Sequence, residues 1–191
     1  MTNDDPAYSF KPSLMGAPCH FALRQEGVQW ERGRYAGLVR YDHIRSVRMS
    51  FRPVTMQSQR YITEIWSSDN PKLMISSASW RSLIEQERLD SAYTAFVTEL
   101  HRRIAAAGAT VAFTSGMPVV TYFIGVVVFA AAILAMGALT VRAMQLDDWK
   151  VAALVGVLFL VFAIQIGNYF RRNLPVRYRP DAIPANVLPR A

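Results

Sequence analysis

Two long apolar runs near the C-terminal end constrain the fold more than any other feature of this sequence. They cover residues 117–141 and 151–167, and neither contains an Asp, Glu, Lys or Arg residue. Crossing the hydrocarbon layer of a bilayer, which is roughly 30 Å thick, takes about 20 apolar residues in a helix. The first run is long enough by itself, and the second reaches that length with Trp149 and Tyr169 at its flanks. The sequence therefore predicts a transmembrane hairpin.

The hairpin divides the chain into a soluble part and a membrane part. The charged residues concentrate before residue 110, and the chain of 191 residues has room for one small soluble domain besides the hairpin. Four prolines after the second span predict an extended, solvated end of the chain. We predict a flexible N-terminal arm, a soluble domain, a first transmembrane helix, an external link, a second transmembrane helix and a basic, Pro-rich cytoplasmic tail at residues 1–16, 17–110, 117–142, 143–149, 150–170 and 171–191.

Positive charges beside the spans predict the orientation of the hairpin. Short segments rich in Lys and Arg stay on the cytoplasmic side of a membrane. The link between the spans holds only Arg142 and Lys150, which two aspartates oppose. The segments outside the hairpin carry more arginines, at Arg102, Arg103, Arg171, Arg172, Arg177 and Arg179. We therefore expect both termini in the cytoplasm.

The soluble part changes from an alternating pattern to a helical one. Apolar and polar residues alternate in several short runs, most clearly over residues 47–52, which predicts half-buried antiparallel strands. Apolar residues then recur every three or four positions over residues 89–104, which is typical of one face of a helix. We predict one long amphipathic helix over residues 79–107, with Ser79 or Ser82 as its N-cap. About six strands and one closing helix place this part in the α+β class.

Three stretches of the soluble part resemble bacterial Pleckstrin-homology-like (bPH) domains. They are residues 21–27, residues 40–47 and the helical residues 81–103. Such domains occur beside transmembrane segments in small membrane proteins. The resemblance implies a small antiparallel PH-like sheet or barrel, closed by the long C-terminal amphipathic helix and followed by the hairpin. It also implies a multi-pass protein of the bacterial inner (cytoplasmic) membrane.

A basic pair flanks Gly33 in a predicted turn between two strands. PH domains that bind phosphoinositides place basic residues at such a turn, so the resemblance implies that Arg32 and Arg34 contact lipid headgroups. Arginine binds phosphate strongly, and anionic phospholipids offer that group. Arg171 and Arg172, beside the second span, are further candidates for headgroup contacts. General attraction to an anionic leaflet and an ordinary solvated turn explain the same residues, so three interpretations stay open.

Further arginines follow the predicted strands of the soluble part. Arg48, Arg52 and Arg60 are interleaved with aromatic residues, a pattern that also occurs in nucleic-acid-binding proteins. The strict alternation around Arg48 and Arg52 favours instead the solvated face of a strand. We therefore expect these three residues to form a face for a protein partner and expect no nucleic acid.

Two polar residues lie within the apolar runs near their inner ends. In an antiparallel hairpin Thr121 and Gln165 fall at similar depth, which predicts an interhelical hydrogen bond worth about 0.6 to 2 kcal/mol. Pairing with the helix of a partner and contact with water are the alternatives. The spans carry no ionisable residue at their middle, so a proton or ion pathway has no candidate relay.

The sequence contains no catalytic, metal or cofactor signature. The three histidines lie far apart, and Cys19 is the single cysteine, which excludes an intrachain disulfide and any site that needs two thiolates. No Gly-rich phosphate loop and no nucleophile elbow occurs. We therefore expect neither an enzyme nor a cofactor.

Two classes of function fit these features. The first is a non-enzymatic inner-membrane accessory or scaffold protein that presents a PH-like module to a protein partner, with homo-oligomerisation as a variant. Two spans anchor a module permanently, so it need not bind lipid to stay at the membrane. The second is a module that binds or senses anionic lipid. A membrane enzyme or transporter is poorly supported by two helices without charge.

Overall fold

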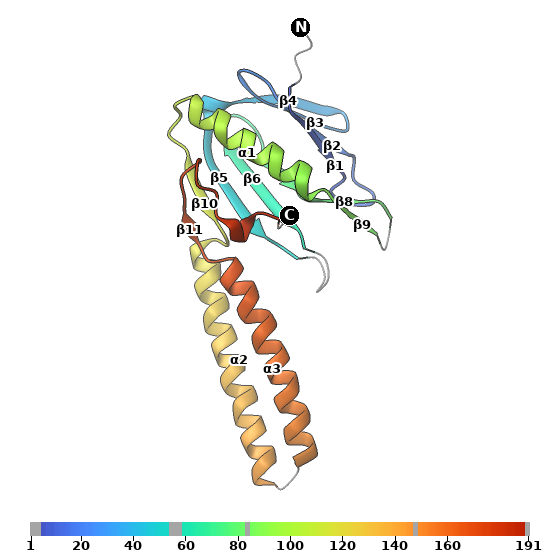
Figure 1. Ribbon diagram of the computed structural model, residues 1–191, viewed down its shortest axis with the longest axis vertical. Coiled ribbons are helices and arrows are strands. Elements are labelled where there is room, and N and C mark those ends of the chain that lie inside the picture. Colours follow the sequence, from blue (N-terminus) through green and yellow to red (C-terminus); the bar gives the residue numbers. More distant parts are fainter. Residues whose placement is uncertain (1–4, 54–58, 83–84, 147–148, 190–191) are drawn as a thin grey trace. The chain divides into compact units, whose positions relative to one another are not determined.

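The computed structural model describes residues 5–53, 59–82, 85–146 and 149–189 (Figure 1). It divides into two compact units. We call them the sheet unit, which ends at Gly116 and resumes at Val176, and the hairpin unit, which runs from Met117 to Pro175. The hairpin is thus an insertion into the sheet unit, whereas the sequence had predicted a soluble domain that ends before it.

Sheet A of the sheet unit is an antiparallel meander in the order β1-β2-β3-β4. Its strands are β1 (Ala7–Phe10), β2 (Cys19–Leu23), β3 (Gly27–Arg32) and β4 (Tyr35–Arg40). Strand β1 lies within the predicted flexible arm, so that prediction is wrong for residues 7–10. The reason is that Tyr8 and Phe10 are buried, and their rings pack against Phe96 and Phe21.

Sheet B has five strands in the order β11-β10-β5-β6-β7. The short 3-10 helix η1 (Tyr41–His43) leads into it, and the strands are β5 (Ile44–Phe51), β6 (Tyr61–Ser67), β7 (Leu73–Ser76), β10 (Ala112–Ser115) and β11 (Val176–Arg177). The predicted alternation is confirmed at Val47 and Met49, which are completely buried on either side of the half-buried Arg48, but Ser50 on the predicted solvated face is also buried. Strand β10 pairs in parallel with β5, and every other pair in the sheet is antiparallel.

Helix α1 (Asp90–Ala106) is shorter than the predicted helix over residues 79–107. The first part of that range forms a small hairpin of β8 (Ala78–Trp80) and β9 (Gln86–Arg88), which the Arg81–Glu87 ion pair supports. The helix begins where the apolar period begins, and its first turn has no side-chain cap, so the predicted serine cap is wrong.

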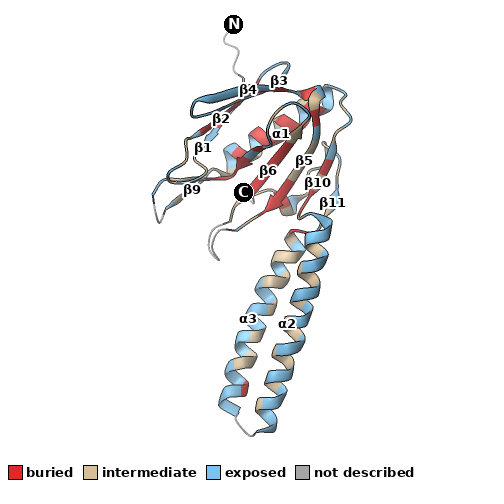
Figure 2. Cartoon of the chain, turned by 180° about the vertical axis from the view of Figure 1, so that it is seen from behind, coloured by how far each residue is buried: buried red, intermediate tan, exposed pale blue. Residues whose placement is uncertain are grey.

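The apolar face of α1 is buried as predicted. Tyr93, Phe96, Val97, Leu100 and Ile104 are at most 3% exposed. Figure 1 shows α1 lying across β5 and β6. Figure 2 shows the burial concentrated in α1 and the strands, whereas α2 and α3 are largely exposed. The sheet unit therefore has one core beneath α1.

The chain after the hairpin docks on the sheet unit, so the prediction of a solvated tail is wrong. Strand β11 pairs with β10, and the Tyr178 ring packs against His101 and Phe113. The 3-10 helix η2 (Ala185–Val187) contacts β5, and Val187 is completely buried. The tail is extended, as predicted, but its strand β11 pairs with the edge of β10.

The hairpin unit consists of two helices that are long and apolar enough to cross a membrane. They are α2 (Val119–Gln145) and α3 (Trp149–Arg172), within three residues of the predicted bounds; residues 147 and 148 of the predicted link lie outside the described residues. Ser115 and Val176 pair across β10 and β11, so the segments before α2 and after α3 share one sheet. Both segments therefore lie on one side of any membrane that the hairpin crosses.

Aromatic rings, and not the predicted polar pair, join α2 and α3. Thr121 and Gln165 are exposed, and no hydrogen bond between them occurs in the described part of the chain. The Phe129 ring instead lies 5.9 Å from Phe162 and 5.7 Å from Phe170, measured between centroids. Packing drives the association of helices in lipid, and these rings pack between α2 and α3.

Replacing Gly125 is expected to loosen the hairpin. A Cβ atom at Gly125 would lie 2.8 Å from the Phe170 ring, so Gly125→Leu should destabilise the helix pair by about 1 to 3 kcal/mol through overpacking. Thermal melting of the helical circular dichroism signal in detergent measures this loss. Thr121→Leu, on an exposed surface of the same helix, is the control and should melt like the parent; equal melting of both variants would refute the packing argument.

Candidate functional site

A cavity of about 300 Å³ lies in the sheet unit between sheet A and β7. Its walls are mainly apolar and come from the four strands of sheet A, from β7 and from the chain beside these strands. Phe21 and Trp30 belong to β2 and β3, Tyr35 begins β4, and Leu73 and Met74 belong to β7. Such concave, mostly apolar sites with a few polar groups are typical of ligand-binding sites.

The register of sheet A places the cavity side chains on one face. Phe21 lies opposite Trp30, and Trp30 lies opposite Gly37. Gly37 is required there, because a Cβ atom at this position would lie 2.9 Å from the Trp30 Nε1 atom. The indole ring therefore lies against the bare backbone of β4. Its buried N–H has no hydrogen-bond acceptor among the described residues.

Two basic residues line the cavity beside its apolar walls. Arg32 is exposed, and no ion pair joins it to any described residue. Lys72 differs, because its Nζ atom lies 2.9 Å from a Glu64 carboxylate oxygen. Burial raises the pKa of the Cys19 thiol, and the nearby Arg32 charge only partly opposes that effect. Cys19 is therefore a protonated wall residue and not a nucleophile. Arg32 lies beside the acidic Glu31 in the same wall, and its guanidinium is a candidate for binding an anionic group.

The cavity and the exit of the chain towards the hairpin lie beside different strands of sheet B. The cavity is bordered by Leu73 and Met74 of β7, and the chain leaves after the last residue of β10. Strands β10 and β7 both run parallel to β5, and the pairings place Leu73 level with Phe113, two residues before the end of β10. Three strand spacings, about 14 Å, separate the two strands.

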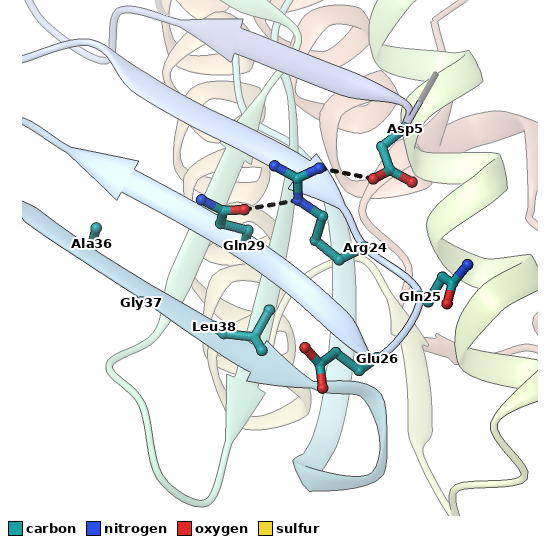
Figure 3. Close-up of a pocket in the computed structure, with 8 residues that line it drawn as sticks. All are labelled: Asp5, Arg24, Gln25, Glu26, Gln29, Ala36, Gly37 and Leu38. Atoms are coloured by element: carbon teal, nitrogen blue, oxygen red, sulfur yellow. Dashed lines mark hydrogen bonds and ion pairs between the residues drawn. The ribbon is translucent and has the colours of Figure 1, made fainter. Parts of the chain in front are cut away.

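A second, wide depression lies on the outer face of sheet A (Figure 3). Arg24 lies at its centre and bonds to Asp5 and Gln29, each at 2.8 Å. These three groups satisfy one another, while the Glu26 carboxylate also lines the depression. Ala36 and Leu38 of β4 form its other wall.

The candidate headgroup residues occur in both units. Arg32 lines the cavity, and Arg34 is exposed beside Gly33, whose φ of 62° provides the left-handed turn between β3 and β4. Arg171 and Arg172 form the last turn of α3 in the hairpin unit. Lipid contact by any of the four stays a prediction, but the cavity beside Arg32 is a feature that the sequence did not reveal.

The candidate partner face is a network of internal contacts. The Arg48 guanidinium lies 5.0 Å from the centre of the Trp66 ring. The Arg52 guanidinium lies 3.0 Å from the Glu64 carboxylate, and the Arg60 Nε atom donates to the Arg52 carbonyl oxygen. The sequence analysis missed Glu64, whose side chain is 3% exposed. In the sequence, Glu64 could have been identified as the single acidic residue of the otherwise uncharged segment that forms β6.

His101 forms a second cluster, which joins α1 to the tail. Its Nδ1 and Nε2 atoms lie 2.7 Å from the Val97 carbonyl oxygen and 2.9 Å from the Tyr178 hydroxyl oxygen. The ring of Phe113 packs against both His101 and Tyr178. Burial lowers the pKa of His101 to about 4, although the bond to Val97 partly opposes this shift. The imidazole is therefore neutral at neutral pH and acts as a structural contact.

Within the described residues, no group of three or more His, Cys, Asp and Glu residues has the arrangement of a metal site. Comparison with known proteins identifies no relative, because no family model, curated protein or solved structure matches the chain. The interpretation of the site therefore depends on the geometry of the cavity.

Proposed function

We propose that this protein is a non-enzymatic adaptor of a bacterial inner membrane, which holds a PH-like module at the cytoplasmic face and binds a protein partner there. The observation that carries the proposal is the apolar cavity beside Arg32, which forms no ion pair with any described residue. An apolar side chain next to an acidic group is the partner chemistry that such a site accepts. The order of elements also supports a PH-like module: a four-stranded meander is followed by a three-stranded meander, by the pair β8 and β9 and then by α1.

The permanent anchor favours a protein over the anchoring bilayer as the source of the ligand. Two spans hold the module at the membrane without any contribution from lipid binding. The alternative is an anionic lipid, which Arg32 and Arg34 beside an apolar cavity favour by their charge.

A photoreactive residue at Met74 distinguishes the two ligands. Met74 lines the cavity and is 37% exposed, and Ala105, on the exposed side of α1, is the control position. We expect full-length protein, activated by light in its native membrane, to yield at Met74 a protein adduct whose mass differs from that of a second copy. Arg32→Glu should reduce that adduct by about tenfold, a loss that corresponds to about 1.4 kcal/mol.

The other outcomes of this experiment decide against the adaptor. A lipid-sized mass increment at Met74 would replace the protein partner with the lipid alternative. An adduct of equal yield at Met74 and Ala105 would show that the cavity binds neither a protein partner nor a lipid selectively, and would refute both proposals. Melting of the Arg32→Glu variant like the parent confirms that the loss of the adduct is not a loss of the fold.

A further inference from the structure

Gln165 carries an unpaired carboxamide on the surface of α3. Its side chain is exposed, and no hydrogen bond joins it to any described residue. Helix geometry places Gln165 about 10 Å along the axis from Arg172 and about 24 Å from Trp149, the two ends of α3. The carboxamide therefore lies within the hydrocarbon layer when α3 spans a bilayer. Its two N–H donors and its carbonyl acceptor find no partner among lipid chains, and an unpaired polar group in such surroundings is unfavourable.

The hairpin itself does not satisfy this carboxamide. A threonine in a span can bond to its own helix, as Thr140 does when its hydroxyl donates to the Met136 carbonyl oxygen at 2.9 Å. Gln165 makes no such bond. It also lies about 140° around the helix axis from Phe170, whose ring packs against Phe129 of α2. A partner for Gln165 therefore has to approach the exposed face of α3.

A second carboxamide and a row of apolar side chains share this face. Asn168 follows Gln165 by three residues, is exposed and has no hydrogen bond with the described part of the chain either. Leu154, Leu158 and Val161 precede Gln165 by eleven, seven and four residues, and all three are exposed. Intervals of three and four residues are those of a heptad seam, along which one helix packs against another. We call these five residues the α3 seam.

We infer that a second copy of this chain packs against the α3 seam, with the two α3 helices parallel about a two-fold axis along the membrane normal. Copies of one sequence cross a membrane in the same direction, because the same charges set that direction. Gln165 of one copy therefore meets Gln165 of the other at the same depth. A carboxamide has both donors and an acceptor, so the two side chains satisfy each other reciprocally, as a two-fold axis requires.

A second copy fits the α3 seam better than lipid or an unrelated helix does. Lipid chains leave the carboxamide of Gln165 unpaired, and an unrelated helix needs a polar group at the same depth, which a second copy has by symmetry. A polar residue in an apolar seam also fixes the register, because displacement along the axis would separate the two carboxamides. Arg172 lies beyond Asn168 at the headgroup level, where water and lipid phosphate screen the like charges of the two copies.

Disulfide trapping locates the interface. The background is full-length Cys19→Ala protein at low density in liposomes, because Cys19 is the single native cysteine and is buried. Val161→Cys should form a covalent dimer under mild oxidation, because a disulfide spans Cα atoms about 4.4 to 6.8 Å apart and opposed residues of a tight seam approach within this range. Leu160→Cys is the matched control. Leu160 is 58% exposed against 47% for Val161, but it lies about 140° around the axis from Gln165, so this variant should remain monomeric.

Three results of the trapping experiment would contradict the proposal. Equal trapping of Val161→Cys and Leu160→Cys would indicate random collision and overturn the interface. An untrapped Val161→Cys protein with the helix content of the parent would overturn the dimer. A parent that is monomeric at every density in single-molecule photobleaching would assign the carboxamides to the helix of another protein, and would equally overturn the second copy.

Substitution of the carboxamide provides a second readout that does not depend on cysteine. Gln165→Leu should weaken the dimer by about tenfold in photobleaching, a loss that corresponds to about 1.4 kcal/mol, because it removes the reciprocal hydrogen bonds. Gln165→Asn keeps a carboxamide and should dimerise more tightly than Gln165→Leu. Thr121→Leu removes an exposed polar group from α2 and should have no effect. Parental dimerisation of Gln165→Leu, or equal weakening by Thr121→Leu, would remove Gln165 from the proposal.

Discussion

Removal of residues 176–191 is expected to destabilise the sheet unit by roughly 4 kcal/mol or more. The truncation removes β11 from the edge of β10, the Tyr178 ring from His101 and Phe113, and the completely buried Val187 from β5. Loss of a large buried side chain costs about 2 to 5 kcal/mol, and a domain of this size is stable by only about 5 to 15 kcal/mol. The truncated protein should therefore lose a large part of its stability and melt at a clearly lower temperature.

Unfolding of the full-length and truncated proteins in detergent measures this loss. Near-ultraviolet circular dichroism reports the packing of the aromatic core, and hydrogen exchange of β10 reports its exposed edge. A point substitution separates the docking of η2 from chain length. Val187→Asp should destabilise the unit by about 3 kcal/mol because it buries a charge, whereas Ala185→Asp, at an exposed position of the same turn, should be neutral.

Two results would contradict this interpretation of the tail. One is a truncated protein that melts at the same temperature as the full-length chain. The other is equal destabilisation by Val187→Asp and Ala185→Asp, because an unspecific effect of negative charge would explain it. Either result would favour the solvated tail that the composition of this segment predicts.

Acidification from pH 7 to pH 4 is expected to reduce the free energy of unfolding by up to about 3 kcal/mol through His101. Its pKa is about 4 in the folded protein and 6.5 in the unfolded chain, so the unfolded chain binds more protons between these values. Stability therefore falls as the pH falls through 6.5 and stops falling from this cause near pH 4. Each unit of pKa difference corresponds to about 1.4 kcal/mol.

His101→Phe identifies the group responsible. The variant keeps a ring beside Phe113 and Tyr178 but has no proton to bind, so its unfolding free energy should not vary between pH 6.5 and 5. Glu99 affects the free energy of unfolding in a separate and lower pH range. Hydrogen bonds from Arg102, and then from Arg103, lower its pKa from 4.5 to about 2, so its contribution is lost only below pH 4.5. A variant with the same slope as the parent between pH 6.5 and 5 would exclude His101 as the cause.

The spacing of apolar residues in the sequence predicted the elements that have one regularly buried face. The face of α1 from Tyr93 to Ile104 and the alternation around Val47 and Met49 are confirmed because burial repeats with the period of each element. The helix was extended too far towards its N-terminus, because residues 79–88 contain many residues that favour helices. Their backbone instead pairs as β8 and β9, and no local preference reveals such a pairing.

The candidate site was only partly accessible to sequence reasoning. Arg32 was selected for its charge, but the cavity beside it requires β3 and β7, which are about 40 residues apart in the chain. Arg48, Arg52 and Arg60 were expected to face a partner, yet each has a contact within the sheet unit: with Trp66, with Glu64 and with the Arg52 carbonyl oxygen, respectively. A charge is visible in a sequence, whereas its compensation depends on which strand lies next to it.

The sequence by itself determined the two apolar helices, the α+β class of the rest and the buried faces of its main elements, because composition and period act over a few neighbouring residues. Only the tertiary structure decided that the hairpin is inserted between β10 and β11, that the tail joins the core through Tyr178 and Val187, and that aromatic rings hold α2 against α3. These features depend on pairing between segments distant in the chain, and such pairing is chosen by the fit of whole surfaces.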